Sequence, residues 1–175
     1  KFKKVTISKN NQQLIDMSSW VFLAITPKVG HKILAKLKFK KNHKIISFIS
    51  TININKLKNY TKSKNIVRVI PLPFIGIRKG PIVIYPNDKK IKKFFDKLGK
   101  TLQINNEKIS KNFWTTSSFM APYYFMMQNN SNWLVRRGVK RKIAEEYTKE
   151  LFLALSQDSI FKNNLSLKQL VSESQ

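Results

Sequence analysis

The sequence has no cysteine among its 175 residues, only two histidines and only nine acidic side chains. The lack of cysteine excludes a disulfide framework, a cysteine-ligated zinc and a thiol nucleophile. His31 and His43 lie apart in lysine-rich surroundings, which does not make a metal site. There is no apolar run long enough to span a membrane, and no apolar segment of a secretory signal follows the basic start. We therefore expect no metal, no membrane partner and a cytoplasmic location.

Acidic residues are also few relative to basic ones, because 34 lysines and arginines give the chain a formal net charge of +25. Such a charge by itself favours nucleic acid or an anionic membrane. However, nearly all the basic residues are lysines, scattered among asparagine and isoleucine, whereas phosphate recognition usually gathers charge on one face and favours arginine. Nucleic acid is therefore an unlikely partner, and a basic nucleic-acid-binding protein is the weaker alternative.

Short apolar runs alternate with helical periodicities over the first hundred residues, which is the pattern of an α/β fold with a parallel sheet. An opening strand is expected at 2–7. The remaining runs predict strands at 20–25, 45–49, 66–70 and 82–85, and the periodic segments predict helices at 12–17, 30–37, 54–60 and 89–98.

The character of the sequence changes after Gly99, where strand-like alternation ends and long apolar stripes begin. The stripes predict helices at 105–131, broken at Pro122, and at 139–156. A last helix is expected at 165–175, with Ser166 as its N-cap. We thus predict an α/β domain over 1–102 and an all-α domain over 103–175, and we interpret the chain as a fragment cut at both ends.

Three predicted strand ends carry distinctive residues, at 24–27, 47–50 and 68–73. Ligands of open parallel sheets sit beyond the carboxyl ends of the strands, so we expect Ser50 and its counterparts at the other two ends to contact a ligand. The five glycines form no G-x-G phosphate loop, although a dinucleotide-binding sheet needs one. The expectation is that this unit lies ahead of Lys1.

These segments together resemble pyrroline-5-carboxylate reductases. The resemblance rests on Asn11, Val21 to Lys28, Ile46 to Ser50, Ile66 to Pro71, and Ala121-Pro122-Tyr123-Tyr124 in the helical half. It implies a Rossmann-type domain that binds NADP or NAD, then a helical domain that forms a homodimer or higher homo-oligomer. It also implies reduction of the cyclic imine pyrroline-5-carboxylate to proline, by a protein of which this fragment alone is inactive.

The resemblance implies which residues of this chain contact the cofactor. Asn11 matches an asparagine near the adenosine ribose, and Pro71 and Leu72 match a loop near the nicotinamide. The cofactor would lie along Ala24, Ile25, Thr26 and Pro27. Thr26 departs from the family, which usually has lysine there, and Leu72 replaces an asparagine.

Substrate contacts fall at the start of the helical half. The family motif Ser-Gly-Ser-Gly-Pro-Ala-Tyr corresponds to a segment in which Ser118 and Pro122 are retained, and Ser118 is the expected catalytic residue. Ser117 and Ala121 complete the predicted substrate site. Phe119 and Met120 replace small residues of the motif, so a related reductase of another imine or an oxo acid is the alternative. A plain helix start with capping hydroxyls is the simpler interpretation of these serines.

Overall fold

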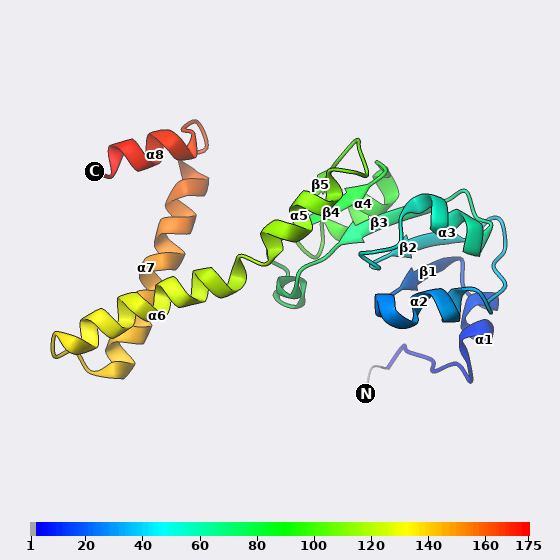
Figure 1. The fold of residues 1–175 in the computed structure, drawn as a ribbon, viewed down its shortest axis with the longest axis horizontal. Coiled ribbons are helices and arrows are strands. Elements are labelled where there is room, and N and C mark those ends of the chain that lie inside the picture. Colours follow the sequence, from blue (N-terminus) through cyan, green and yellow to red (C-terminus); the bar gives the residue numbers. More distant parts are fainter. Residues whose placement is uncertain (1–2) are drawn as a thin grey trace. The chain divides into compact units, whose positions relative to one another are not determined.

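The computed structural model describes residues 3–175 and divides into two compact units, one ending at Ser117 and the other running over Ser118–Gln175 (Figure 1). The first unit therefore extends beyond the predicted domain boundary at residue 102. The reason is that α5 (Ser110–Ser117) lies against the sheet of the first unit. None of the helices in the described part of the chain is both long and apolar enough to cross a membrane.

The first unit is built on a five-stranded sheet in the order β1-β2-β3-β4-β5. The strands are β1 (Trp20–Leu23), β2 (Lys44–Ser47), β3 (Ile66–Ile70), β4 (Pro81–Tyr85) and β5 (Lys100–Gln103). β1 and β2 are parallel to β3, and β4 is parallel to β5, but β3 and β4 are antiparallel. The α/β class is confirmed, with a sheet that is mostly parallel instead of wholly so.

The reversed direction of β4 corrects the expectation of an all-parallel sheet. A parallel crossover needs about a dozen residues, usually including a helix, to return the chain to the same edge. The segment between Ile70 and Pro81 is shorter, and it holds only the 3-10 helix η1 (Pro73–Ile77). The chain therefore turns back beside β3 instead of crossing over.

The two faces of the sheet bury separate apolar clusters, because successive side chains of a strand point to opposite faces. Ile45 of β2 belongs to the cluster covered by α1 (Asn11–Asp16), α2 (Pro27–Leu34) and α3 (Ile54–Thr61). Its neighbour Ile46 belongs to the other cluster, which α4 (Lys89–Phe95) covers with Ile91 and Phe95. The sheet is thus sandwiched between helices, as in α/β folds.

A salt bridge between Lys44 and Asp88 ties the start of β2 to the start of α4. Asp88 is the N-cap of α4, and its side chain accepts a hydrogen bond from the backbone N–H of Ile91 at 2.9 Å. Burial by itself raises the pKa of the Asp88 carboxyl, but the hydrogen bond from Lys44 and the helix amides hold that pKa below its ordinary value. The carboxylate therefore stays ionised and fixes α4 against the sheet.

The predicted opening strand is wrong. Phe2 lies outside the described residues, and the segment from Lys3 to Lys9 contains no strand. Val5 and Ile7 are 64% and 92% exposed. No strand in the described part of the chain pairs with them, and an unpaired strand leaves its backbone groups without hydrogen-bond partners.

The second unit consists of α6 (Met120–Arg136), α7 (Arg141–Phe161) and α8 (Leu167–Glu173), and α6 packs against α7. The break before α6 falls at Ser118 and Phe119 and not at Pro122, because a proline in the first helical turn costs no hydrogen bond. Ser166 caps α8 as predicted.

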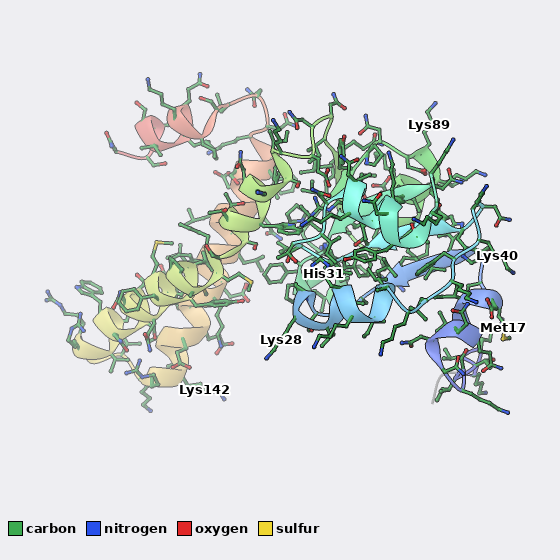
Figure 2. All side chains as sticks on the ribbon, turned by 45° about the vertical axis from the view of Figure 1, so that its right-hand side comes forward. Met17, Lys28, His31, Lys40, Lys89 and Lys142 are labelled. Carbon is green, nitrogen blue, oxygen red and sulfur yellow. The ribbon has the colours of Figure 1, made fainter. Side chains whose placement is uncertain are left out.

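Lysine side chains surround the first unit instead of gathering on one face. Lys28 on α2, Lys40 ahead of β2 and Lys89 on α4 lie on different sides of this unit (Figure 2). These three lysines therefore do not form one phosphate-binding face on the first unit.

Gly99 lies where β4 and β5 meet, and it tests this packing directly. A Cβ at Gly99 would sit 2.5 Å from the carbonyl oxygen of Gly80, whereas a Cβ at Gly76 would meet no atom within 4 Å. We expect Gly99→Ala to lower the free energy of unfolding by about 1 to 3 kcal/mol, and Gly76→Ala to change it by less than about 0.5 kcal/mol. Urea denaturation of both variants measures this. Equal effects would contradict the described β4–β5 packing.

Candidate functional site

Three strand ends meet at one edge of the first unit because β1, β2 and β3 run in the same direction. Residues 24–27 follow β1, residues 48–50 follow β2 and residues 71–73 follow β3. The prediction that these three ends lie together is confirmed. In open sheets this carboxyl edge is where ligands bind.

A cavity of about 330 Å³ opens at this edge between the ends of β2 and β3 and helix α5. Ser50 comes from the end of β2, Pro71 and Leu72 follow β3, and Trp114 and Ser117 are contributed by α5. The remaining lining residues are Phe48, Val69 and Ile70. The lining thus combines apolar and aromatic side chains with polar surface that includes two hydroxyl groups, and small-molecule sites join apolar surface to a few polar groups in this way.

The hydroxyl of Ser117 uses its proton in a hydrogen bond within α5. It donates a hydrogen bond to the carbonyl of Trp114 at 2.6 Å, and Thr116 similarly donates to the carbonyl of Phe113 at 2.9 Å. The oxygen of Ser117 therefore offers lone pairs, and not its proton, to a ligand. A bound group that donates an N–H or O–H matches it best.

A second, smaller cavity of about 170 Å³ adjoins the first and shares Ile70, Leu72 and Ser117 with it. Its other lining residues are Pro81, Val83, Phe113 and Thr116. Because the two hydroxyls donate to backbone carbonyls, this side chamber presents an almost wholly apolar surface. Apolar cavities of about 150 Å³ can hold a benzene-sized molecule.

Arg68 is a buried charge directly beneath the cavity. It lies on β3 between Val67 and Val69, which point to the face covered by α4, so its side chain points to the other face. Its Nη1 donates to Oε1 of Glu107 at 2.7 Å, and its Nη2 donates to the carbonyl of Ser50 at 2.7 Å. Its guanidinium carbon lies 5.2 Å from the centre of the Trp114 ring, within cation–π range.

Glu107, in the loop before α5, completes this arrangement. Its Oε1 also accepts the backbone N–H of Ile54, the first residue of α3, at 2.9 Å. A carboxylate at a helix N-terminus satisfies an otherwise unpaired amide and is favoured by the helix dipole. One ion pair therefore joins β3, the loop after β2, α3 and α5.

The start of α2 lies at the same edge and differs from its prediction. The helix begins at Pro27 instead of Gly30, with Thr26 as N-cap and no hydrogen bond from the Thr26 side chain to a helix amide. Proline is favoured at the first helical position because its backbone angle is already helical. Ala24, Ile25 and Thr26 thus lie between β1 and α2, Pro27 begins α2, and none of the four lines the cavity described above.

The other predicted site residues fall in different places. Ser50, Pro71, Leu72 and Ser117 line one cavity. Asn11 is the exposed first residue of α1 and not the end of a strand, and it does not line this cavity. Ser118, Ala121 and Pro122 are exposed residues at the start of the second unit.

Sequence reasoning missed Arg68, Glu107 and Trp114 as parts of the site. A signal was present for Arg68, because an arginine within the run Ile66-Val67-Arg68-Val69-Ile70 of a buried strand must find a partner. Glu107 is one of only nine acidic residues in the chain, so the number of possible partners for Arg68 is small. Trp114 was missed because the periodicity of apolar residues does not show that α5 packs against the sheet.

Solved structures of similar fold are pyrroline-5-carboxylate reductases. The enzyme from Streptococcus pyogenes matches with a TM-score of 0.82 and 22% identity, over 95% of this chain and 66% of that one. The Plasmodium falciparum enzyme, with NADP bound, matches with a TM-score of 0.79 and 20% identity, over 95% and 66% of the two chains. The Coxiella burnetii enzyme matches with a TM-score of 0.74 and 18% identity, over 96% and 66%.

The chain thus has the fold of these reductases and spans 66% of their length. No protein-family profile matches the sequence, and no curated protein matches it significantly. The resemblance inferred from the sequence is therefore confirmed in its fold.

The Arg68–Glu107 pair is expected to matter far more than a surface pair. The Arg68 side chain is 7% exposed, whereas both side chains of the Lys92–Asp96 pair are 40% exposed. Glu107→Gln leaves the buried guanidinium without its counter-charge, and we expect it to cost about 2 to 4 kcal/mol of unfolding free energy. Asp96→Asn, measured in the same urea denaturation experiment, should cost much less. Equal losses would show that the buried pair is not formed.

Proposed function

We propose that this chain is part of an NAD(P)H-dependent reductase of a cyclic imine, with pyrroline-5-carboxylate, reduced to proline, as the first substrate to test. The observation that carries the proposal is the cavity at the carboxyl ends of β2 and β3, bordered by α5. It is supported by the fold shared with pyrroline-5-carboxylate reductases, one of them with NADP bound.

The cavity residues fit the nicotinamide end of NADP or NAD. Phe48, Pro71 and Trp114 offer apolar and aromatic surface to a flat ring, and Ser50 offers a hydroxyl to its amide. The pyrophosphate end has no counterpart in the described residues, since no glycine-rich turn precedes a helix there. Residues outside this chain would have to bind it.

When bound, the reduced nicotinamide supplies a hydride to the imine carbon. The side chains of this chain would hold and orient the substrate and exclude water from the reacting atoms. The Ser117 oxygen, which can only accept, suits the N–H of an imine that arrives protonated. Ser118 and Pro122, retained from the family motif, are proposed to bind the substrate, with Ser118 as the catalytic hydroxyl.

The side chamber favours a second candidate, an imine that carries an apolar substituent. Leu72 lines both the chamber and the main cavity and stands where the family has asparagine, so an apolar side chain replaces a polar contact. A substituent of about the size of a benzene ring would fit this chamber. A small oxo acid without such a substituent would leave it unfilled.

The reductase proposal is tested by oxidation of NADPH or NADH in the presence of an imine, with the complete protein. We expect turnover, and we expect Ser50→Phe, which fills the cavity, to lower kcat/KM at least about tenfold. Ser19→Phe, at an exposed position ahead of β1, should leave it unchanged. Absence of turnover with either nucleotide on every imine tested would contradict the proposal.

The same assay separates the two substrate candidates. A preference for 2-phenyl-1-pyrroline over pyrroline-5-carboxylate, reduced by Leu72→Asn, would support the imine with an apolar substituent. A preference for pyrroline-5-carboxylate that Leu72→Asn leaves intact would support the proline precursor.

We also propose that the second unit forms a homodimer. Ala144 is its single buried apolar residue among those described, while Phe125, Trp133 and Tyr147 are 62%, 51% and 56% exposed. Helices with this much exposed apolar surface usually bury it against another subunit. A second copy of the chain offers the same apolar helices.

Sedimentation of the chain over a range of concentrations tests this proposal. We expect a dimer whose dissociation constant rises at least about tenfold in Phe125→Glu, because a charge would enter the apolar interface. Gln157→Glu, which adds the same charge at an exposed polar position of α7, is the control. A chain that is monomeric at all concentrations would rule out the dimer.

A further inference from the structure

Arg68 occupies a costly position for a charged residue. It lies on β3, the middle strand of the sheet, and is 7% exposed. Among the described residues, its Nε has no hydrogen-bond partner. A buried charge with an unsatisfied donor is destabilising compared with an apolar residue of similar size, so stability alone does not account for an arginine here.

The contacts of this guanidinium fall on the walls of the candidate cavity. Ser50, whose carbonyl accepts from Nη2, lines the cavity from the end of β2, and Trp114, whose ring lies 5.2 Å from the guanidinium carbon, lines it from α5. Glu107, bound by Nη1, holds the loop that leads into α5. Pro71 and Leu72 follow Arg68 on the same strand. Every segment that contributes to the cavity is therefore joined to this one side chain.

We infer that Arg68 is a positioning residue, which sets the separation between Ser50 and Trp114 and so holds the cavity at the width its ligand needs. The role of Arg68 in the cavity wall can be measured without any reaction, whereas its expected effect on kcat rests on the proposed reductase function. Arg68 acts through Ser50, Glu107 and Trp114, and it is not itself among the residues that line the cavity.

A lysine cannot perform this task. The planar guanidinium donates in two directions at once and presents a flat face to the indole ring, whereas an ammonium group is a single point charge. Arg68→Lys keeps the charge beside Glu107 but loses the simultaneous hydrogen bond to Ser50 and the stacking on Trp114. It therefore separates positioning from charge neutralisation.

Collisional quenching of Trp114 fluorescence by acrylamide reports the cavity without any assumption about the reaction. Trp20→Phe and Trp133→Phe leave Trp114 as the single tryptophan. In this background we expect Arg68→Lys to increase Trp114 quenching, because the wall formed by α5 loosens. Lys92→Met, which breaks the exposed pair with Asp96, should not change it. Quenching that Arg68→Lys leaves unchanged would overturn the inference.

The catalytic readout uses the complete protein once wild-type turnover is established. Misplacement of the cavity walls by about 1 Å should lower kcat by about 10²-fold in Arg68→Lys, with a smaller change in the KM for the nucleotide. A general loss of folded protein would instead lower activity at constant KM in proportion to the unfolded fraction, which urea denaturation measures. Unchanged kcat in an active enzyme would also overturn the inference.

Glu107→Asp provides a second variant if Arg68→Lys does not fold. It keeps the carboxylate but shortens its reach by one methylene, so we expect an intermediate increase in Trp114 quenching. Wild-type quenching in Glu107→Asp would count against the inference. Complete absence of turnover by the wild-type protein would contradict the proposed reductase and leave the quenching result to decide the role of Arg68.

Discussion

The parallel pairing of β1, β2 and β3 is the constraint on which the site depends. It brings three strand ends to one edge, where backbone groups and short loops are free to line a cavity. The reversal of β4 then places Pro81 and Val83 beside the end of β3, because Val83 pairs with Ile70. This arrangement produces the apolar side chamber next to the main cavity. Both cavities thus follow from strand direction, and the side chains decide what each accepts.

The sequence predicted strands well where several branched apolar residues follow one another. Ile66 to Ile70 was located to the residue, because a buried strand needs such a run on both faces. β5 was missed because Leu102 is its one large apolar residue, and Thr101 is its one buried side chain. The predicted start of α2 was wrong because Pro27 was interpreted as the residue that ends a strand, whereas it occupies the first position of the helix.

The candidate site was predictable only in part. Ser50, Pro71, Leu72 and Ser117 came from strand-end positions and from the resemblance, and the structure brings them to one cavity. Arg68, Glu107 and Trp114 are joined by contacts between residues far apart in the sequence, which periodicity does not encode. The prediction that Asn11 ends a strand was wrong, because the described residues ahead of it form no strand and Asn11 begins α1.

The two units have different sources of stability. The first has two apolar clusters on opposite faces of a sheet, enough for an independent core. The second buries almost no apolar side chain and exposes aromatic residues along both long helices, so its stability is expected to depend on another subunit.

The most direct test of the central claim is a crystal structure of the complete protein grown with NADPH. The account predicts a nicotinamide ring in van der Waals contact with Pro71 and Trp114, inside the cavity that Ser50 and Ser117 line. A nucleotide bound elsewhere, with this cavity filled by protein side chains, would contradict it.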